Sequence, residues 1–345
     1  MNSACSKTLR KGQIAVVMKE IYRTASSMKA GMVLLGLVGA ATAVGSWLAP
    51  EAFFMTIPFK LLLVLLFINM TLCTIRRIAG YLKRFSSSTN TKVFRLREAG
   101  IFLLHAGVLL VLIGGAAFAY SGQSAEIILK EGETVHINRF IRAERPFSLR
   151  LNRFEISYYP DGSPSQYLSD VSIIEGSSEI KRYSISVNHP LRYGGVKAYQ
   201  QSFGYLVEAV GINEKKGERI AKSLNEGEFI GIPDTPRRVK MYKYIPNFDP
   251  RYGMESKTLR PDNPKVIYSV YEEGKLLGVG AASPGERIAV GDGCYVAFRE
   301  VRPYSVLKLK TDPGIPLTAA GGLMLIAGVV LAVLSGKPND CASSR

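Results

Sequence analysis

Residue types that carry metal and redox chemistry are scarce in this chain of 345 residues, which has 4 cysteines, 3 histidines and 1 tryptophan. The cysteines, which are Cys5, Cys73, Cys294 and Cys341, form no C-x-x-C pair and no C-x-x-C-H haem-attachment motif. The histidines are far apart in the sequence and form no cluster with metal-ligand spacing. These absences exclude a thiol oxidoreductase and a c-type cytochrome.

Acidic residues are scarce in one part of the chain only. Residues 120–314 hold 28 Lys/Arg and 24 Asp/Glu, whereas the other 150 residues hold 16 Lys/Arg and 4 Asp/Glu. Most of the net charge of +16 therefore flanks apolar segments. This distribution predicts membrane topology and gives no indication of a nucleic-acid partner.

Apolar runs long enough to cross a membrane occur four times. Ala99–Ala119 is the clearest, because it contains no formally charged residue. A bilayer core about 30 Å thick needs roughly 20 residues at 1.5 Å each. We predict four transmembrane α-helices, at residues 30–49, 52–75, 99–119 and 315–335.

Basic residues outside the four predicted helices indicate which side of the membrane each segment occupies. The N-terminal segment 1–29 and the loop 76–98 are rich in Lys and Arg and are expected in the cytoplasm. The tail 336–345 carries Lys337 and Arg345 and is expected there too. Residues 120–314 must then lie on the exported side.

The exported segment reads as β-rich, with alternating apolar residues and many turn signals. The fold class is therefore a membrane protein with a large β-rich domain between its third and fourth helices, and we expect a sandwich or distorted barrel of short strands. Ile127–Leu129 and Thr134–Ile137 flank a turn signal and predict a hairpin. A change in the alternation predicts a β-bulge near Asn152-Arg153.

His105 lies in the middle of the third apolar run. A titratable side chain in hydrocarbon is costly and indicates a functional site, although hydrogen bonding to a neighbouring helix is the alternative. The residue lies six positions from Ala99, or about 9 Å from the predicted cytoplasmic end of the helix.

Glycines recur every seven residues on the third and fourth predicted helices. Small residues at this spacing share a helix face and let two backbones approach closely, so we predict that the two helices pack through them. His105 lies about 200° around the helix from Gly107 and points away from that face. The glycines are Gly100, Gly107, Gly114, Gly314, Gly321 and Gly328. Asn69 and Thr71 in the second helix are expected to join helices by hydrogen bonds.

The other two histidines lie in the exported segment. His136 falls in a predicted strand close to the membrane, and a structural role is favoured over a ligand role. His189 precedes Pro190, which favours an extended turn conformation, so Asn188-His189-Pro190 is favoured as a turn. Cys294 is expected to be a small buried hydrophobic residue.

The order of local motifs resembles the ResB-like cytochrome c biogenesis proteins over nearly the whole chain. The resemblance rests on the first helical hairpin and on the Leu-Leu-His-Ala-Gly sequence around His105. It also rests on Asn-His-Pro-Leu-Arg-Tyr-Gly-Gly, which contains Asn188, Pro190, Gly194 and Gly195 and continues to Tyr199 and Gln200. Two alternatives stay open for Gly194-Gly195 and Tyr199-Gln200, which form either part of the protein core or a surface for a partner protein.

This resemblance implies a subunit that moves haem b, as a transported substrate, across the bacterial inner membrane. It implies a CcsA/ResC-type membrane partner, C-x-x-C-H apocytochrome c as the client and a thioredoxin-like thiol reductant. His105 would be an axial ligand of the haem iron, and His189 and His136 are weaker candidates. Because the chain shows no nucleophile or acid–base pair of its own, it is expected to be a non-catalytic or shared subunit of a haem lyase complex.

Two other functions fit the same sequence. A membrane-anchored scaffold would use its exported β domain to bind a partner, without binding haem, and His105 would then join helices. A subunit of a general exporter is disfavoured, because transporters show inverted repeats or broken helices near the midplane. The chain shows four plain spans instead.

Overall fold

A computed structural model describes residues 20, 22–48, 53–85 and 92–334. Two compact units are present, residues 1–122 with 312–345 and residues 123–311, which we call the helical unit and the β unit. The described helices of the first unit that are long and apolar enough to span a membrane number four. The predicted fold class is confirmed: three such helices precede the β-rich region and one follows it.

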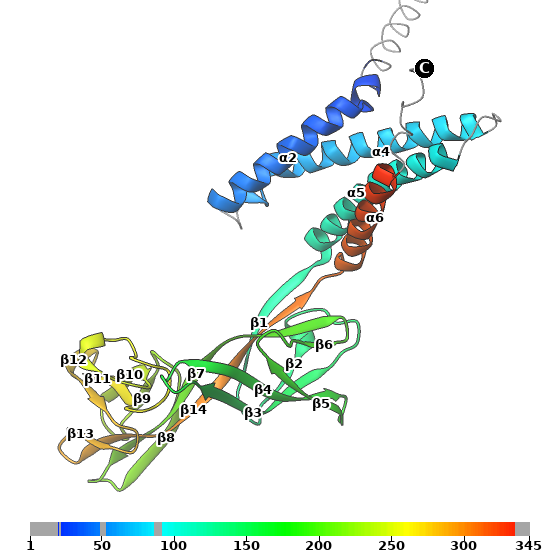
Figure 1. Cartoon of the computed structure of the whole chain (residues 1–345). Coiled ribbons are helices and arrows are strands. Elements are labelled where there is room, and N and C mark those ends of the chain that lie inside the picture. The colour runs from blue at the N-terminus through cyan, green and yellow to red at the C-terminus, as the bar shows by residue number, and fades with distance from the viewer. Residues whose placement is uncertain (1–19, 21, 49–52, 86–91, 335–345) are drawn as a thin grey trace, which may run out of the picture. The chain divides into compact units, whose positions relative to one another are not determined.

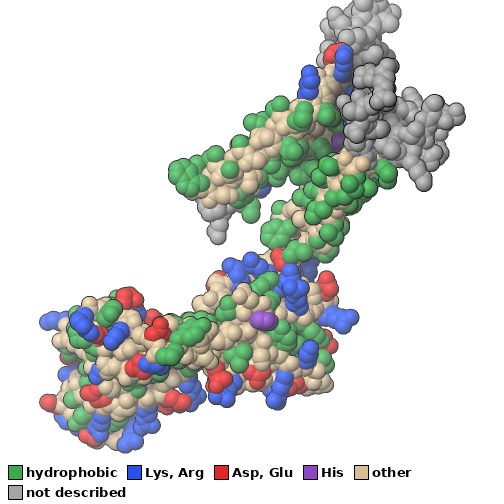
Figure 2. Space-filling view, in the orientation of Figure 1, with side chains coloured by type: hydrophobic (Ala, Val, Ile, Leu, Met, Phe, Trp, Pro, Cys, Tyr) green, Lys and Arg blue, Asp and Glu red, His purple; other side chains and the backbone are tan. Residues whose placement is uncertain are grey.

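The helical unit contains α2 (Met28–Leu48), α4 (Ile57–Phe85), α5 (Lys92–Ser121) and α6 (Ile315–Leu334). Their side chains are mostly apolar and exposed, as Figure 2 shows. Exposed apolar surface on this scale is the property of a helix solvated by lipid. The candidate span on α5 covers Leu96–Ser121 and contains the predicted helix 99–119.

The β unit is built from three antiparallel sheets (Figure 1). Sheet A has the order β1-β14-β7-β6, with β13 paired to β14 and β8 paired to β7. Its strands are β1 (Gln123–Leu129), β6 (Leu191–Tyr193), β7 (Val196–Asn213), β8 (Glu218–Leu224), β13 (Arg287–Gly291) and β14 (Cys294–Thr311).

Two four-stranded sheets pack on sheet A. Sheet B has the order β2-β3-β4-β5, with strands β2 (Thr134–His136), β3 (Ser148–Tyr158), β4 (Pro164–Glu175) and β5 (Ser178–Ser186). Sheet C has the order β12-β11-β10-β9, with strands β9 (Phe229–Gly231), β10 (Arg237–Ile245), β11 (Lys265–Glu272) and β12 (Lys275–Ala282). The 3₁₀ helices are η1 (Ile137–Arg139) and η2 (Pro250–Tyr252).

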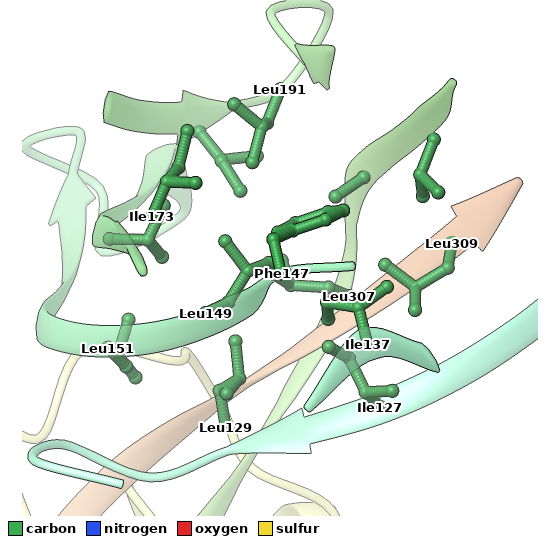
Figure 3. Close-up of a cluster of buried hydrophobic side chains, with 14 of the residues drawn as sticks. Ile127, Leu129, Ile137, Phe147, Leu149, Leu151, Ile173, Leu191, Leu307 and Leu309 are labelled. Atoms are coloured by element: carbon green, nitrogen blue, oxygen red, sulfur yellow. The ribbon is translucent and has the colours of Figure 1, made fainter. Parts of the chain in front are cut away.

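Two apolar cores divide the β unit into lobes. The first lobe joins sheet B to the half of sheet A that ends at Gln123 and Thr311, and side chains from β1, β3, β4 and β14 meet in its core (Figure 3). The second lobe joins sheet C to the other half of sheet A, around Phe298 and Met241. Cys294 is buried in this second core, as predicted.

The strands β7 and β14 serve both cores and are 18 residues long, so the expectation of short strands was wrong for them. Register shifts occur on these strands between Val306 and Leu307 and between Phe298 and Val301. Each inserted residue shifts the alternation of buried and exposed side chains by one position. On β7, even-numbered residues such as Ala198 are therefore buried in the first core and odd-numbered residues such as Val207 in the second. These bulges keep one face of sheet A apolar along its whole length.

The bulge predicted near Asn152 is confirmed by the register shift between Leu151 and Arg153. The hairpin predicted between the first two strands is wrong. β1 pairs with β14, whereas β2 pairs with β3 in another sheet. The turn between β1 and β2 therefore passes the chain from one sheet to the other.

Candidate functional site on the third helix

The imidazole of His105 makes one hydrogen bond within its own helix. Its Nδ1 lies 2.8 Å from the carbonyl oxygen of Ile101, one turn earlier. Because a carbonyl oxygen can only accept, Nδ1 must carry the proton. In a neutral ring this tautomer leaves the lone pair on Nε2, which is the form that suits a metal ligand.

His105 is six residues from Ala99, where the uncharged part of α5 begins, or about 9 Å along the helix. The side chain is half-buried, and Phe102 beside it on the helix surface is exposed.

The opposite side of α5 packs on α6 through glycines. A Cβ atom added at Gly107 would lie 2.8 Å from the carbonyl oxygen of Gly321. The equivalent distances are 2.9 Å between Gly100 and Gly328 and 2.8 Å between Gly114 and Gly314. The two backbones are therefore in contact at three levels, and His105 is left on another face of α5.

An ion pair joins α5 to α4 two turns before His105. Arg77 on α4 contacts Glu98 on α5 through two hydrogen bonds, Nε to Oε2 at 3.2 Å and NH2 to Oε1 at 3.3 Å. Glu98 and His105 are seven residues apart and share a helix face. The signal for this pair in the sequence is that Glu98 is the one acidic residue among the basic residues of segment 76–98.

Asn69 on α4 joins two helical segments, as predicted. Its side-chain amide donates to the carbonyl oxygens of Ala25 at 2.7 Å and Ser27 at 3.2 Å. Both acceptors lie where the helix is interrupted before α2. Thr71 donates to the Phe67 carbonyl oxygen of its own helix at 2.8 Å.

The structure places the other two histidines in the β unit, far from His105 in sequence. His136 is exposed, and its Nδ1 is 2.6 Å from the Ser148 hydroxyl on the neighbouring strand. His189 is exposed in the turn before β6, where its backbone bonds to Ser186 in both directions. Asn188 in that turn has a φ of 66°, a conformation that asparagine tolerates better than most residues.

Gly194 and Gly195 form the two-residue turn between β6 and β7, with φ values of 56° and 78°. Positive φ at both positions is the requirement of a type I′ turn. The turn packs on the segment before β3, because the Glu144 amide donates to the Gly194 carbonyl at 2.8 Å. A Cβ atom at Gly194 would lie 2.9 Å from the Arg145 carbonyl oxygen.

Gln200 lies at a bulge of β7 and belongs to a buried polar network. Its Oε1 accepts hydrogen bonds from Ser169 at 2.7 Å and Ser305 at 3.1 Å. Tyr199 is opposite Lys308 on the outer face of sheet A, and the carbonyl of Pro190 accepts from Tyr183. These contacts account for the motif residues as parts of the first lobe.

Among the described residues, no group of three or more His, Cys, Asp or Glu side chains could hold a metal ion.

The fold and the intramembrane histidine define a polytopic membrane protein with a β-rich domain between its third and fourth spans. The ResB-like family model matches residues 94–294, and the chain belongs to that family. The resemblance seen in the sequence is confirmed.

Cytochrome c biogenesis protein CcsB of Picosynechococcus sp. is 30% identical over 249 residues, which are 68% of this chain and 50% of the relative. The same protein of Thermosynechococcus vestitus is 29% identical over 248 residues, covering 68% and 52%. The chain thus spans about half the length of these relatives. Cytochrome c haem lyase CcmF aligns over 88% of this chain and 34% of its own, with 12% identity and a TM-score of 0.31.

Proposed function

We propose that the chain is the subunit of a cytochrome c biogenesis complex that carries haem b across the membrane and supports its covalent attachment to C-x-x-C-H apocytochromes. One observation carries this proposal. His105 lies within the candidate membrane span Leu96–Ser121, and its Nδ1 is 2.8 Å from the Ile101 carbonyl oxygen, so Nε2 is the ring nitrogen that could bind a metal.

Haem is the transported substrate in this proposal. A neutral imidazole is a good axial ligand for haem iron. The flanking side chains on α5, such as Phe102 and Leu109, are apolar and suit the porphyrin face. A CcsA/ResC-type membrane partner would supply the second axial ligand.

The charge distribution supports an orientation for the complex in the bacterial inner membrane. The basic N-terminal segment and the basic loop before α5 face the cytoplasm under the positive-inside rule, which places the β unit outside. Attachment would then occur outside the membrane, where a thioredoxin-like reductant keeps the apocytochrome thiols reduced. His105 would act during transfer through the membrane, before attachment.

The test is His105→Ala, purified together with the membrane partner. We expect loss of haem from the complex and loss of covalent cytochrome c in cells, with partial restoration of both by added imidazole. Ile326→Ala is the matched control, because it shortens an exposed apolar side chain on another membrane helix, α6. Its haem content should stay near that of the parent.

A scaffold that never binds haem predicts a colourless complex in all these samples. A parental haem content in His105→Ala, without imidazole, would also contradict the ligand role. Helix packing through His105 predicts a third result, because free imidazole cannot replace a side chain that joins two helices.

A further inference from the structure

A row of basic residues crosses the outer face of sheet A. Arg192 on β6 is opposite Lys197 on β7, Lys197 is opposite Lys310 on β14, and Lys310 is opposite Ser124 on β1. Directly opposite residues of antiparallel strands share a face. The neighbouring positions, such as Leu309, are buried in the first core, so this row faces away from the core.

A short loop adds two arginines and a phenylalanine at the same end of the first lobe. Ile137 and Ile141 anchor the loop in the core, which turns Arg139, Phe140 and Arg142 outward. Phe140 is 49% exposed. The backbone amide of Arg142 donates to the side-chain oxygen of Gln123 at 2.7 Å, which ties the loop to the first residue of β1.

A shallow depression of about 540 Å³ lies at this junction. It is lined by Gln123, Ser124 and the loop 138–142. Figure 2 shows Lys and Arg side chains gathered on this part of the first lobe. The depression therefore combines an exposed aromatic ring with two guanidinium groups and polar side chains.

The first and last residues of the β unit are joined to two membrane helices by short segments. One residue, Gly122, separates the end of α5 from Gln123, and three residues separate Thr311 from α6. Ser124 and Lys310 lie two residues from Gly122 and Asp312, respectively, or about 7 Å along the strands. The headgroup layer on each side of a bilayer is about 5–7 Å deep.

Basic side chains grouped on one face of a sheet give that face a positive potential, which attracts anionic groups. Aromatic rings also favour the depth between headgroups and hydrocarbon. The basic row therefore favours the anionic headgroups, and the aromatic ring of the loop favours the boundary just beneath them.

We propose that this basic rim, comprising Arg139, Phe140, Arg142, Arg192, Lys197 and Lys310, binds the headgroups of anionic phospholipids. The phosphate groups would pair with the basic side chains, and Phe140 would enter the layer beneath them. This contact would hold the first lobe on the membrane surface. It is independent of whether the complex carries haem.

The experiment uses the full chain in nanodiscs with a single tryptophan as probe. Trp47→Phe removes the native tryptophan, and Phe140→Trp places one in the rim. Phosphatidylcholine carrying a spin label on its headgroup quenches tryptophan at headgroup depth. We expect stronger quenching when phosphatidylglycerol replaces part of the phosphatidylcholine, and no such increase when inorganic phosphate is added instead.

The rim variant combines Arg139→Gln, Arg192→Gln and Lys310→Gln and should lose the increase caused by phosphatidylglycerol. Each basic residue at an anionic surface contributes about fivefold in affinity. The matched control removes three exposed basic residues of the second lobe, through Arg219→Gln, Arg238→Gln and Lys275→Gln. That control should keep the full increase.

A salt series on the chain with an intact rim provides a readout that does not depend on the variant folding. The increase in tryptophan quenching caused by phosphatidylglycerol should disappear at about 1 M salt, where the screening length falls to about 3 Å. Equal quenching with and without phosphatidylglycerol would overturn the proposal. So would an unquenched Phe140→Trp probe, or a rim variant that behaves like the control.

Discussion

The two units of this protein are stabilised by different interactions. In the helical unit, α5 and α6 meet through backbone contacts at six glycines, and most apolar side chains remain exposed. In the β unit, apolar side chains from three sheets are buried in two cores. Lipid provides no hydrophobic driving force between helices, so close packing must replace it, whereas water drives the burial of apolar surface in the β unit.

The helical unit itself contains a second contrast. The α5–α6 pair uses glycines and backbone contact, while α4 is joined to the segment before α2 by the amide of Asn69. The first contact is extended over the helices and the second is confined to one side chain. The four predictions below test these differences, starting with the largest expected effect.

Phe298→Ala should destabilise the β unit by about 3–5 kcal/mol, because Phe298 is fully buried in the second core and its removal leaves a cavity. Thermal denaturation followed by near-ultraviolet circular dichroism measures the loss. Val279→Ala is the control, since Val279 is 75% exposed. Equal melting of the two variants would contradict the assignment of Phe298 to a packed core.

Gly321→Leu should separate α5 from α6 and cost about 3 kcal/mol. Even a Cβ atom at this position would lie 2.7 Å from the Gly107 carbonyl oxygen, so the helices must move apart. Gly322→Leu is the matched control on the adjacent residue, where a Cβ atom meets nothing within 4 Å. Thermal stability in detergent should fall for the first variant only, and a similar fall for both would refute close packing at Gly321.

The β unit should lose stability as the pH rises from about 10 to about 12. Burial raises the pKa of Tyr244 from 10.0 to about 12, so the unfolded chain ionises first and gains stability over that interval. The loss is about 1.4 kcal/mol per pH unit for one such group. Tyr244→Phe should reduce this alkaline slope of the unfolding free energy, and an unchanged slope would show that other groups cause it.

Asn69→Ala should destabilise the helical unit by about 1 kcal/mol. The substitution removes the donor shared by the Ala25 and Ser27 carbonyls, and interhelical hydrogen bonds in membranes are of this size. Thr71→Ala serves as the control, because Thr71 bonds only within its own helix among the described residues. If both variants melt at the parental temperature, the Asn69 contact does not stabilise the unit.

The sequence predicted what depends on local pattern. Apolar length alone identifies the four helices, and the change of alternation around Asn152 identifies a bulge. The hydrogen bond from His105 to Ile101 was not predicted, because the alternative drawn from the sequence was a bond to a neighbouring helix. The chemical role of His105 stays a prediction.

The partners of strands could not be predicted in the same way. A turn signal follows Leu129, yet β1 pairs with β14, whose residues lie about 180 positions later. Nothing in the local sequence specifies so distant a partner. For the same reason, Arg192, Lys197 and Lys310 look unrelated in sequence, and only the strand register brings them into one row.

The pairing of β1 with β14 also constrains how the protein is made. Gln123 is opposite Thr311, so the first strand of the β unit must wait for the last one to be synthesised. At about 5–20 residues per second, the interval is on the order of ten to forty seconds. During this time α5 is already in the membrane without α6, and its glycine face is open to other helices. A ribosome stalled before Thr311 would therefore leave both units incomplete at once.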